Sequence, residues 1–229
     1  NINIQTMKNL LTFILLAISL SSFCQTITVD TTFAQVGRTF IVRRQCVDEK
    51  YIILSIYDNK ALILKDTLDF IGPGGGFDLW DFDMDGNKDL LLTMIGNNPI
   101  SFLYLFDITK NSFKNVEGFN DFPQANAVKG QKNIYYSYHR SGCADANWVS
   151  DLFKIVNFET IQIGHIYGKG CDFEVGENPP VIEIYKILDN DEEKEELIQK
   201  IPYSKGVEEY GDKWDFIENY WSNNYKRFE

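Results

Sequence analysis

The stretch Trp80-Asp81-Phe82-Asp83-Met84-Asp85-Gly86-Asn87-Lys88-Asp89-Leu90-Leu91-Leu92 carries the strongest local signal in the chain. Its carboxylates recur at alternate or nearly alternate positions, and carboxylates packed this closely repel one another unless a cation lies among them. A hard cation such as Ca²⁺ takes about six to eight oxygen ligands, and an Asp-x-Asp-x-Asp-Gly loop supplies several of them in one turn. The glycine permits the sharp turn because it accepts a positive φ angle. The sequence therefore predicts a calcium loop.

The expected ligands follow from their spacing. Four aspartates would give side-chain oxygens and one asparagine a main-chain oxygen, and the set is Asp81, Asp83, Asp85, Asn87 and Asp89. An EF-hand would place a bidentate glutamate at the twelfth position of the loop, where this chain has Leu92. A strand-like sequence follows instead of a helix. We therefore expect the ion to fasten two strands together, not to act as an EF-hand sensor.

The chain on both sides of this loop has the pattern of short β-strands. Roughly a dozen segments rich in β-branched and aromatic residues are separated by Gly, Asn or Asp turns. Alternation is clear in 51–57 and 181–187, and the turn at 58–60 predicts a hairpin with 61–64. We expect a mainly β fold, a propeller-like or sandwich-like stack of short antiparallel strands, in a domain that spans 25–187.

The composition changes after residue 187, which predicts a C-terminal helical tail over 188–229. Segment 189–198 is highly charged and rich in good helix formers, so a first helix is expected there. Segment 212–221 is expected to form a second helix, because apolar side chains recur at helical spacing. They are Trp214, Ile217, Tyr220, Trp221 and Tyr225. That face is expected to pack on the β domain.

Residues 1–24 are expected to be missing from the mature protein. Met7 is the expected start, an apolar run follows over 10–20, and small residues at Ser22 and Cys24 precede a cleavage point after Cys24. The apolar run is short for a membrane span, and an uncleaved anchor is the alternative. We expect an exported protein, in the periplasm or outside the cell, whose mature chain has no membrane span.

The formal net charge of −11 limits the classes of partner. An acidic surface argues against nucleic acid and anionic membranes, whose phosphates would repel it. It favours a basic protein as partner. The charge is explained equally well as a means of keeping an exported protein soluble.

The cysteines and the segment around residue 140 suggest a rigid binding loop. An oxidising compartment favours a disulfide, and Cys143 and Cys171 each follow a glycine in loop-like sequence. We expect these two to pair and Cys46 to stay free or buried. Such a bridge would hold the preceding loop rigid, which suits partner binding. The candidate contact residues are Tyr138, His139, Arg140 and Ser141, and an ordinary strand connection is the alternative.

Catalysis is not expected from the sequence. The histidines, His139 and His165, lack a Gly-x-Ser-x-Gly nucleophile elbow nearby, and the clustered carboxylates are better explained by a metal ion. The glycine-rich segment 72–76 has no following Lys-Ser/Thr pair, so it is not a phosphate loop. A hydrolase that uses carboxylates or His139 remains a third hypothesis, which the absence of a cleft with converging ionisable groups would remove.

Two family resemblances follow from these motifs. Asp81 to Leu90 resembles the calcium loop of FG-GAP and VCBS repeats, which joins two strands of a propeller blade, and the chain carries it once. The chain also resembles exported bacterial immunity proteins related to periplasmic lysozyme inhibitors. This resemblance rests on the same loop together with the aromatic strand Tyr104 to Asp107, the turn Lys110 to Phe113 and a Tyr-rich strand after it. That resemblance implies a non-catalytic protein that inhibits a cell-wall hydrolase, with a basic peptidoglycan hydrolase as the expected partner. The FG-GAP resemblance implies the alternative, a calcium-stabilised surface or adhesion module that binds glycan or matrix.

Overall fold

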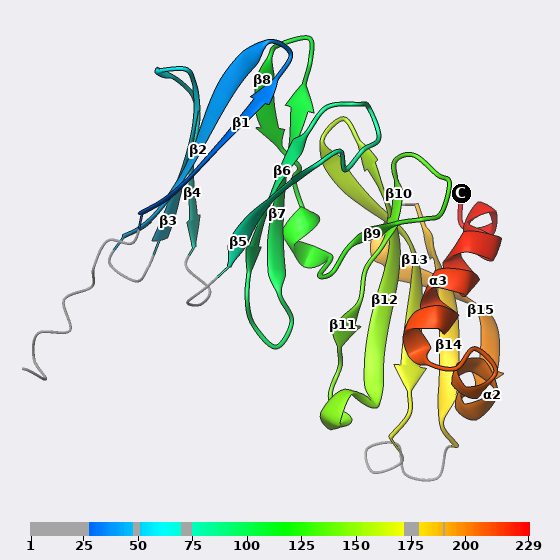
Figure 1. Ribbon diagram of the computed structural model, residues 1–229. Coiled ribbons are helices and arrows are strands. Elements are labelled where there is room, and N and C mark those ends of the chain that lie inside the picture. Colours follow the sequence, from blue (N-terminus) through cyan, green and yellow to red (C-terminus); the bar gives the residue numbers. More distant parts are fainter. Residues whose placement is uncertain (1–27, 48–50, 70–74, 172–178, 190) are drawn as a thin grey trace, which may run out of the picture. The chain divides into compact units, whose positions relative to one another are not determined.

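The structure is a computed structural model that describes residues 28–47, 51–69, 75–171, 179–189 and 191–229. It confirms the mainly β fold: the described strands form three antiparallel sheets of four, seven and four strands (Figure 1). The chain divides into two compact units, Asn1–Phe70 and Ile71–Glu229, and each is described by itself. The expected signal peptide over 1–24 lies outside the described residues.

The first unit contains one four-stranded meander in which each strand pairs with the next along the chain. Its strands are β1 (Thr28–Gln35), β2 (Arg38–Val47), β3 (Tyr51–Asp58) and β4 (Ala61–Asp69). Asn59 adopts a positive φ angle of 54° in the turn between β3 and β4, as the expected hairpin requires. The hairpin predicted from 51–57 and 61–64 is thus confirmed.

The second unit begins with another four-stranded meander, and the aspartate loop connects its first two strands. The strands are β5 (Gly76–Trp80), β6 (Asp89–Met94), β7 (Ile100–Asp107) and β8 (Ser112–Asn115). Trp80 pairs with Asp89, so the loop closes a hairpin at its base. A short 3-10 helix, η1 (Phe119–Asp121), follows β8.

A seven-stranded antiparallel sheet completes the unit, in the order β15-β14-β13-β12-β10-β9, with β11 paired to β12. The strands are β9 (Asn126–Ala127), β10 (Ile134–Tyr136), β11 (His139–Arg140), β12 (Asn147–Val156), β13 (Glu159–Lys169), β14 (Val181–Leu188) and β15 (Asp191–Pro202). Between β11 and β12 lies the 3-10 helix η2 (Cys143–Asp145). Strand β12 is central: it pairs with β10, β11 and β13.

The two faces of β12 take part in different cores because successive side chains point to opposite faces of a strand. Trp148 and Leu152 belong to a core that includes buried residues of the C-terminal helix. Phe153 and Ile155 belong to a second core, shared with residues of β7 and η1. The second unit is therefore sandwich-like where its two sheets meet.

Helix α3 (Lys213–Asn224) covers one face of the seven-stranded sheet, as the sequence predicts (Figure 1). It is preceded by α2 (Tyr203–Glu208) and followed by the 3-10 helix η3 (Tyr225–Arg227). Trp221 is fully buried and its indole nitrogen donates a hydrogen bond of 2.8 Å to the Ser150 hydroxyl. Close packing here needs glycine at position 168, where an added Cβ would lie 2.1 Å from Cε2 of Trp148.

The helix predicted over 189–198 is wrong. Residues 191–202 form β15, an edge strand of the seven-stranded sheet. It pairs with β14: Val181 lies opposite Pro202 at one end, and Leu188 lies opposite Asp191 at the other. Helix propensity is a weak preference, and the pairing partner supplied by β14 overrides it. The charged side chains of Lys194, Glu195 and Glu196 are exposed, as expected for an edge strand that must not pair with other chains. The C-terminal region 188–229 is thus a strand followed by helices.

Within the residues that the structure describes, no helix is both long enough and apolar enough to cross a membrane.

Candidate functional site

The aspartate loop brings three of the five predicted ligands together. One carboxylate oxygen each from Asp81, Asp83 and Asp89 lie within 4.8 Å of one another. The carboxylate of Asp85 instead accepts hydrogen bonds from the main-chain and side-chain nitrogens of Asn87, at 2.7 and 3.0 Å. Gly86, with a φ angle of 98°, makes the turn that the sequence predicted. The triad supplies the hard oxygen donors that Ca²⁺ prefers.

The electrostatics of the triad are those of carboxylates crowded in a poorly solvated place. Asp89 is only 1% exposed, and its oxygens accept hydrogen bonds of 2.8 Å from the main-chain nitrogens of Phe82 and Phe106. Burial raises the pKa of Asp89 to about 7, although these two hydrogen bonds oppose the rise. Burial and the neighbouring charge of Asp85 also raise the pKa of Asp83. A bound cation would relieve both effects.

The loop is also tied to the seven-stranded sheet. Phe82, which lies between two of the aspartates, is 1% exposed and stacks on Tyr135 of β10 with ring centroids 4.8 Å apart. The Lys132 amine donates a hydrogen bond of 2.6 Å to the carbonyl oxygen of Met84. The position of the loop is therefore fixed by contacts with both sheets of the second unit.

The second candidate feature is the segment that follows β10, and its backbone is held on both sides. His139 and Arg140 form β11, which pairs with Val149 and Trp148 of β12. On the other side, the Asn98 amide bonds to the main chain of Arg140, accepting from its nitrogen at 2.9 Å and donating to its oxygen at 3.2 Å. The Asn98 side chain thus takes the place of a neighbouring strand, because it satisfies one donor and one acceptor of β11.

The tip of this loop is fixed by Asp145. Its carboxylate pairs with the Lys213 amine of α3 at 2.6 Å and accepts a hydrogen bond from the hydroxyl of Tyr138. Cys143, Ala144 and Asp145 have positive φ angles of 54°, 50° and 75°, a region that costs energy for residues other than glycine. The surrounding contacts hold the tip in this conformation.

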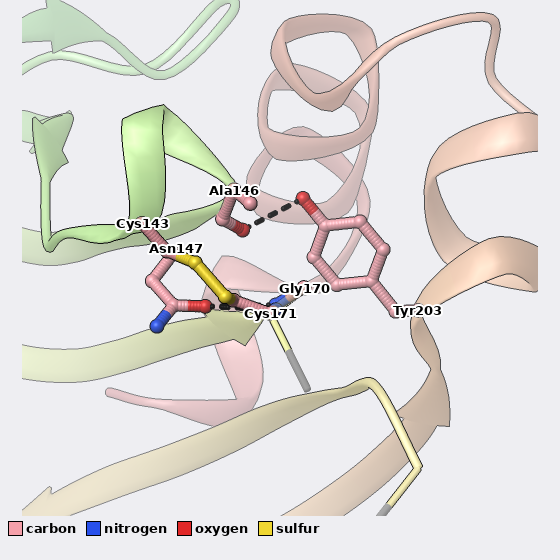
Figure 2. Close-up of a disulfide and its surroundings, with 6 residues drawn as sticks. All are labelled: Cys143, Ala146, Asn147, Gly170, Cys171 and Tyr203. Carbon is pink, nitrogen blue, oxygen red and sulfur yellow. Dashed lines mark hydrogen bonds between the residues drawn. A yellow bond between two sulfur atoms is a disulfide. The ribbon is translucent and has the colours of Figure 1, made fainter. Parts of the chain in front are cut away.

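The predicted disulfide between Cys143 and Cys171 is present, with Cα atoms 6.1 Å apart (Figure 2). Cys46 is free and partly buried. Beside the bridge, the Asn147 amide oxygen accepts hydrogen bonds from the main-chain nitrogens of Gly170 and Cys171, at 3.0 and 3.1 Å. The Tyr203 hydroxyl donates to the carbonyl oxygen of Ala146 at 3.0 Å. Figure 2 shows these contacts around the sulfur atoms, where they fasten the base of the loop.

The four residues predicted to contact a partner have different environments. Tyr138 is only 2% exposed and packs against Trp214 with ring centroids 3.9 Å apart, so it supports the loop and is not a surface contact. His139 and Ser141 are partly buried. Arg140 is open to solvent, with 56% of its side chain exposed. It lines a hollow of about 600 Å³ together with Asn97, Asn98, Gly142, Ala144 and Asp145, and we call these six residues the Arg140 rim.

A cavity of about 310 Å³ on the same unit was not anticipated from the sequence. Its ionisable lining residues are Asp121, His139, Asp151, His165 and Glu195. Asp151 is 6% exposed, and its carboxylate accepts hydrogen bonds from His165 Nδ1 and Gln162 Nε2, both at 2.8 Å. Burial lowers the pKa of His139. The nearby charge of Asp151 opposes this decrease, and the nearby charge of His165 reinforces it. Since a cleft with converging ionisable groups exists, the hydrolase hypothesis is not removed.

The comparisons with known proteins leave the family open. No protein-family model matches the chain, and a search of curated proteins found no match. One solved structure, described as that of a Xanthomonas Type IV secretion system related protein, is similar to it with a TM-score of 0.44 and 13% sequence identity. The similarity covers 78% of this chain and 96% of that chain. It is too distant to carry an argument about function.

Proposed function

We propose that this chain is an exported, non-catalytic β protein that binds and inhibits a basic peptidoglycan hydrolase through the Arg140 rim. The observation that carries the proposal is the bracing of the loop: β12, the Asn98 amide, the Asp145–Lys213 pair and the disulfide all hold it. A loop already fixed in one conformation loses little entropy on binding, which favours tight inhibition.

The chemistry of the rim suits a hydrolase cleft. Enzymes that cleave glycosidic bonds use a pair of carboxylates across the scissile bond. The Arg140 side chain is 56% exposed, and its Nε lies 3.7 Å from the Asp145 carboxylate. The two terminal nitrogens of the guanidinium would bind a carboxylate of the enzyme through two parallel hydrogen bonds. Gly142 and Ala144 beside it are small and exposed, so they leave room for the walls of a cleft. The overall charge of −11 would speed the encounter with a basic enzyme.

In this proposal the aspartate loop binds Ca²⁺ for structural reasons. Asp81, Asp83 and Asp89 would supply side-chain oxygens, with Asp85 and the Asn87 carbonyl as the further ligands that the motif predicts. The ion would not take part in inhibition. Its contribution would be to hold the β5–β6 hairpin against the seven-stranded sheet.

The test is an inhibition assay on a panel of lysozymes and peptidoglycan hydrolases, read as clearing of a cell-wall suspension. The wild-type protein is expected to inhibit at least one basic enzyme of the panel. Arg140→Ala is expected to weaken inhibition by about tenfold or more, as truncation of an interface anchor does. Arg38→Ala is the matched control, since Arg38 is also a surface arginine but lies on β2, outside the rim. An absence of inhibition across the panel would refute the proposal.

A further inference from the structure

A hollow of about 450 Å³ lies beside the end of β15, where the chain turns back into α2 and α3 (Figure 1). It shares no lining residue with the Arg140 rim. The chain as a whole has a formal net charge of −11. This hollow instead has three cations in its lining, Lys200, Lys205 and Arg227, against one carboxylate, that of Glu209. Its local charge is therefore opposite in sign to that of the whole chain.

The guanidinium of Arg227 is held in the hollow through one of its three nitrogens. Its Nη1 donates to Gln199 Oε1 and Asn224 Oδ1, both at 3.4 Å, and to the Tyr220 hydroxyl at 3.5 Å. Among the described residues, neither Nε nor Nη2 has a hydrogen-bond partner, and no carboxylate forms an ion pair with Arg227. The edge of the guanidinium formed by Nε and Nη2 is therefore available to a ligand.

The protein fixes the place of this guanidinium before any ligand arrives. The Lys186 amine donates a hydrogen bond of 3.1 Å to the carbonyl oxygen of Arg227. The next residue, Phe228, is only 2% exposed and packs on Trp221 with ring centroids 5.0 Å apart. The N–H bonds of Nε and Nη2 are parallel, and such a fork matches two oxygens of a carboxylate or a phosphate.

Aromatic rings extend from Arg227 along the hollow. The Tyr220 ring, whose hydroxyl contacts Arg227, lies 5.8 Å from the ring of Phe216, and Phe216 lies 5.7 Å from Tyr210. Tyr210 ends the row and is 42% exposed, so its ring can pack against a ligand. Lys205 of α2 has no ion pair with another described residue, and its charge adds to the attraction of anions.

We propose that this hollow binds a small amphipathic anion. Its carboxylate or phosphate group would pair with Nε and Nη2 of Arg227, and an apolar or aromatic body would lie along the rings towards Tyr210. The paired anion would neutralise a cation that has no acidic partner among the described residues, and the body would remove apolar surface from water. The site is separate from the Arg140 rim, so it does not depend on inhibition of a hydrolase.

A nuclear magnetic resonance titration of the isotope-labelled protein, in a buffer without phosphate or carboxylate, tests the proposal. The probes are phenyl phosphate, 3-phenylpropionate, inorganic phosphate and the uncharged benzyl alcohol. We expect at least one of the two aromatic anions to bind saturably at one per chain, with shifts of the main-chain amide signals of Gly206 and Tyr210. The tighter of the two identifies the preferred anionic group. Benzyl alcohol is expected to bind at least about tenfold more weakly, because it lacks the charge that Arg227 recognises.

Three variants locate the site. Arg227→Met is expected to weaken binding of the aromatic anion by about tenfold or more, the usual effect of losing hydrogen bonds to a charged group. Lys226→Met is the matched control, because Lys226 is the neighbouring exposed cation and does not line the hollow, and its affinity should equal that of the wild type. Tyr210→Ala should weaken the aromatic anion by about threefold and leave inorganic phosphate unchanged.

Three outcomes would overturn the proposal. They are no saturable binding of either aromatic anion by the wild-type protein, an equal loss in Arg227→Met and Lys226→Met, and binding of benzyl alcohol as tight as that of the anions. The second would show diffuse attraction to surface charge. The exposed position of Arg227 makes unfolding of its variant an unexpected result, and the dispersion of the amide signals checks the fold in the same experiment.

Discussion

At the scale of single residues, Glu183 on β14 is the clearest source of pH dependence. It is 6% exposed, and its carboxylate contacts the amines of Lys169 and Lys200 at 2.5 and 2.6 Å and the hydroxyl of Tyr185 at 2.9 Å. Burial opposes ionisation, but the hydrogen bonds from these three groups and the charge of Lys169 outweigh it and hold the pKa at about 2. The carboxylate is therefore ionised in the folded protein at all but strongly acidic pH.

We predict that Glu183→Gln lowers the free energy of unfolding by about 2 kcal/mol at pH 7, the usual value for hydrogen bonds to a charged group. The unfolded-state pKa is near 4.5. A pKa that is depressed on folding contributes stability above the unfolded value and loses it as the pH falls towards the folded value. Urea unfolding of both proteins should show the full difference in free energy of unfolding above pH 5. This difference should shrink to zero as the pH falls from 4.5 to 2. If the difference in free energy of unfolding stays constant over this pH range, Glu183 is not the source of the pH dependence.

Individual site residues differ in how far the sequence could reveal them. The aspartate triad was predictable because its members lie in one short turn, so their spacing alone brings them together. The cavity of His139, Asp151 and His165 was not, because it depends on the register of β11, β12 and β13. Tyr138 was misjudged for a similar reason: the helix that buries it begins about 75 residues further along the chain.

At the scale of elements, the loop between β11 and β12 depends on the disulfide. We predict that the Cys143→Ser, Cys171→Ser double variant lowers the free energy of unfolding by about 3 kcal/mol, since the bridge closes a loop with a sequence separation of 28. Cys46→Ser is the matched control and should unfold like the wild type, because Cys46 is free. Denaturant unfolding with and without reductant measures the free energy of unfolding of the wild type and of both variants. If reductant leaves the wild-type transition unchanged, the bridge does not contribute.

Strand β15 shows what a local pattern cannot decide. Residues 191–196 are charged and resemble an exposed helix, whereas Leu197 and Ile201 further along the strand pair with Tyr185 and Ile182 of β14. An exposed edge strand tolerates charge on its surface as a helix does, so composition cannot separate the two states. Strands β3 and β14 were predictable because the alternation in 51–57 and 181–187 agrees with the final pairing.

At the scale of the whole molecule, the aspartate loop connects the two sheets of the unit Ile71–Glu229. Phe82 packs in the core shared by both sheets, and Lys132 bonds to the loop backbone from the other side. The isolated pairing of Glu117 with Glu159 is a second link between them. An ion that orders this loop would therefore stabilise the packing of the sheets and not only one hairpin.

We predict that chelation of calcium lowers the melting temperature by about 5–10 °C when calcium was present at about 100 times its dissociation constant, since binding to the folded state alone contributes about 2.7 kcal/mol. Asp83→Asn should melt at the lower temperature with or without EDTA.

Asp78→Asn is the control: Asp78 is an exposed acid on β5 outside the triad, and the variant should respond to EDTA as the wild type does. Added Ca²⁺ should restore the wild-type transition and Mg²⁺ should not, because Mg²⁺ keeps its water ligands and demands a tighter geometry. A melting curve unmoved by EDTA would show that the triad holds no structural calcium, and the loop would then owe its order to the packing of Phe82 and to its hydrogen bonds, those of Asp89 and Lys132 among them.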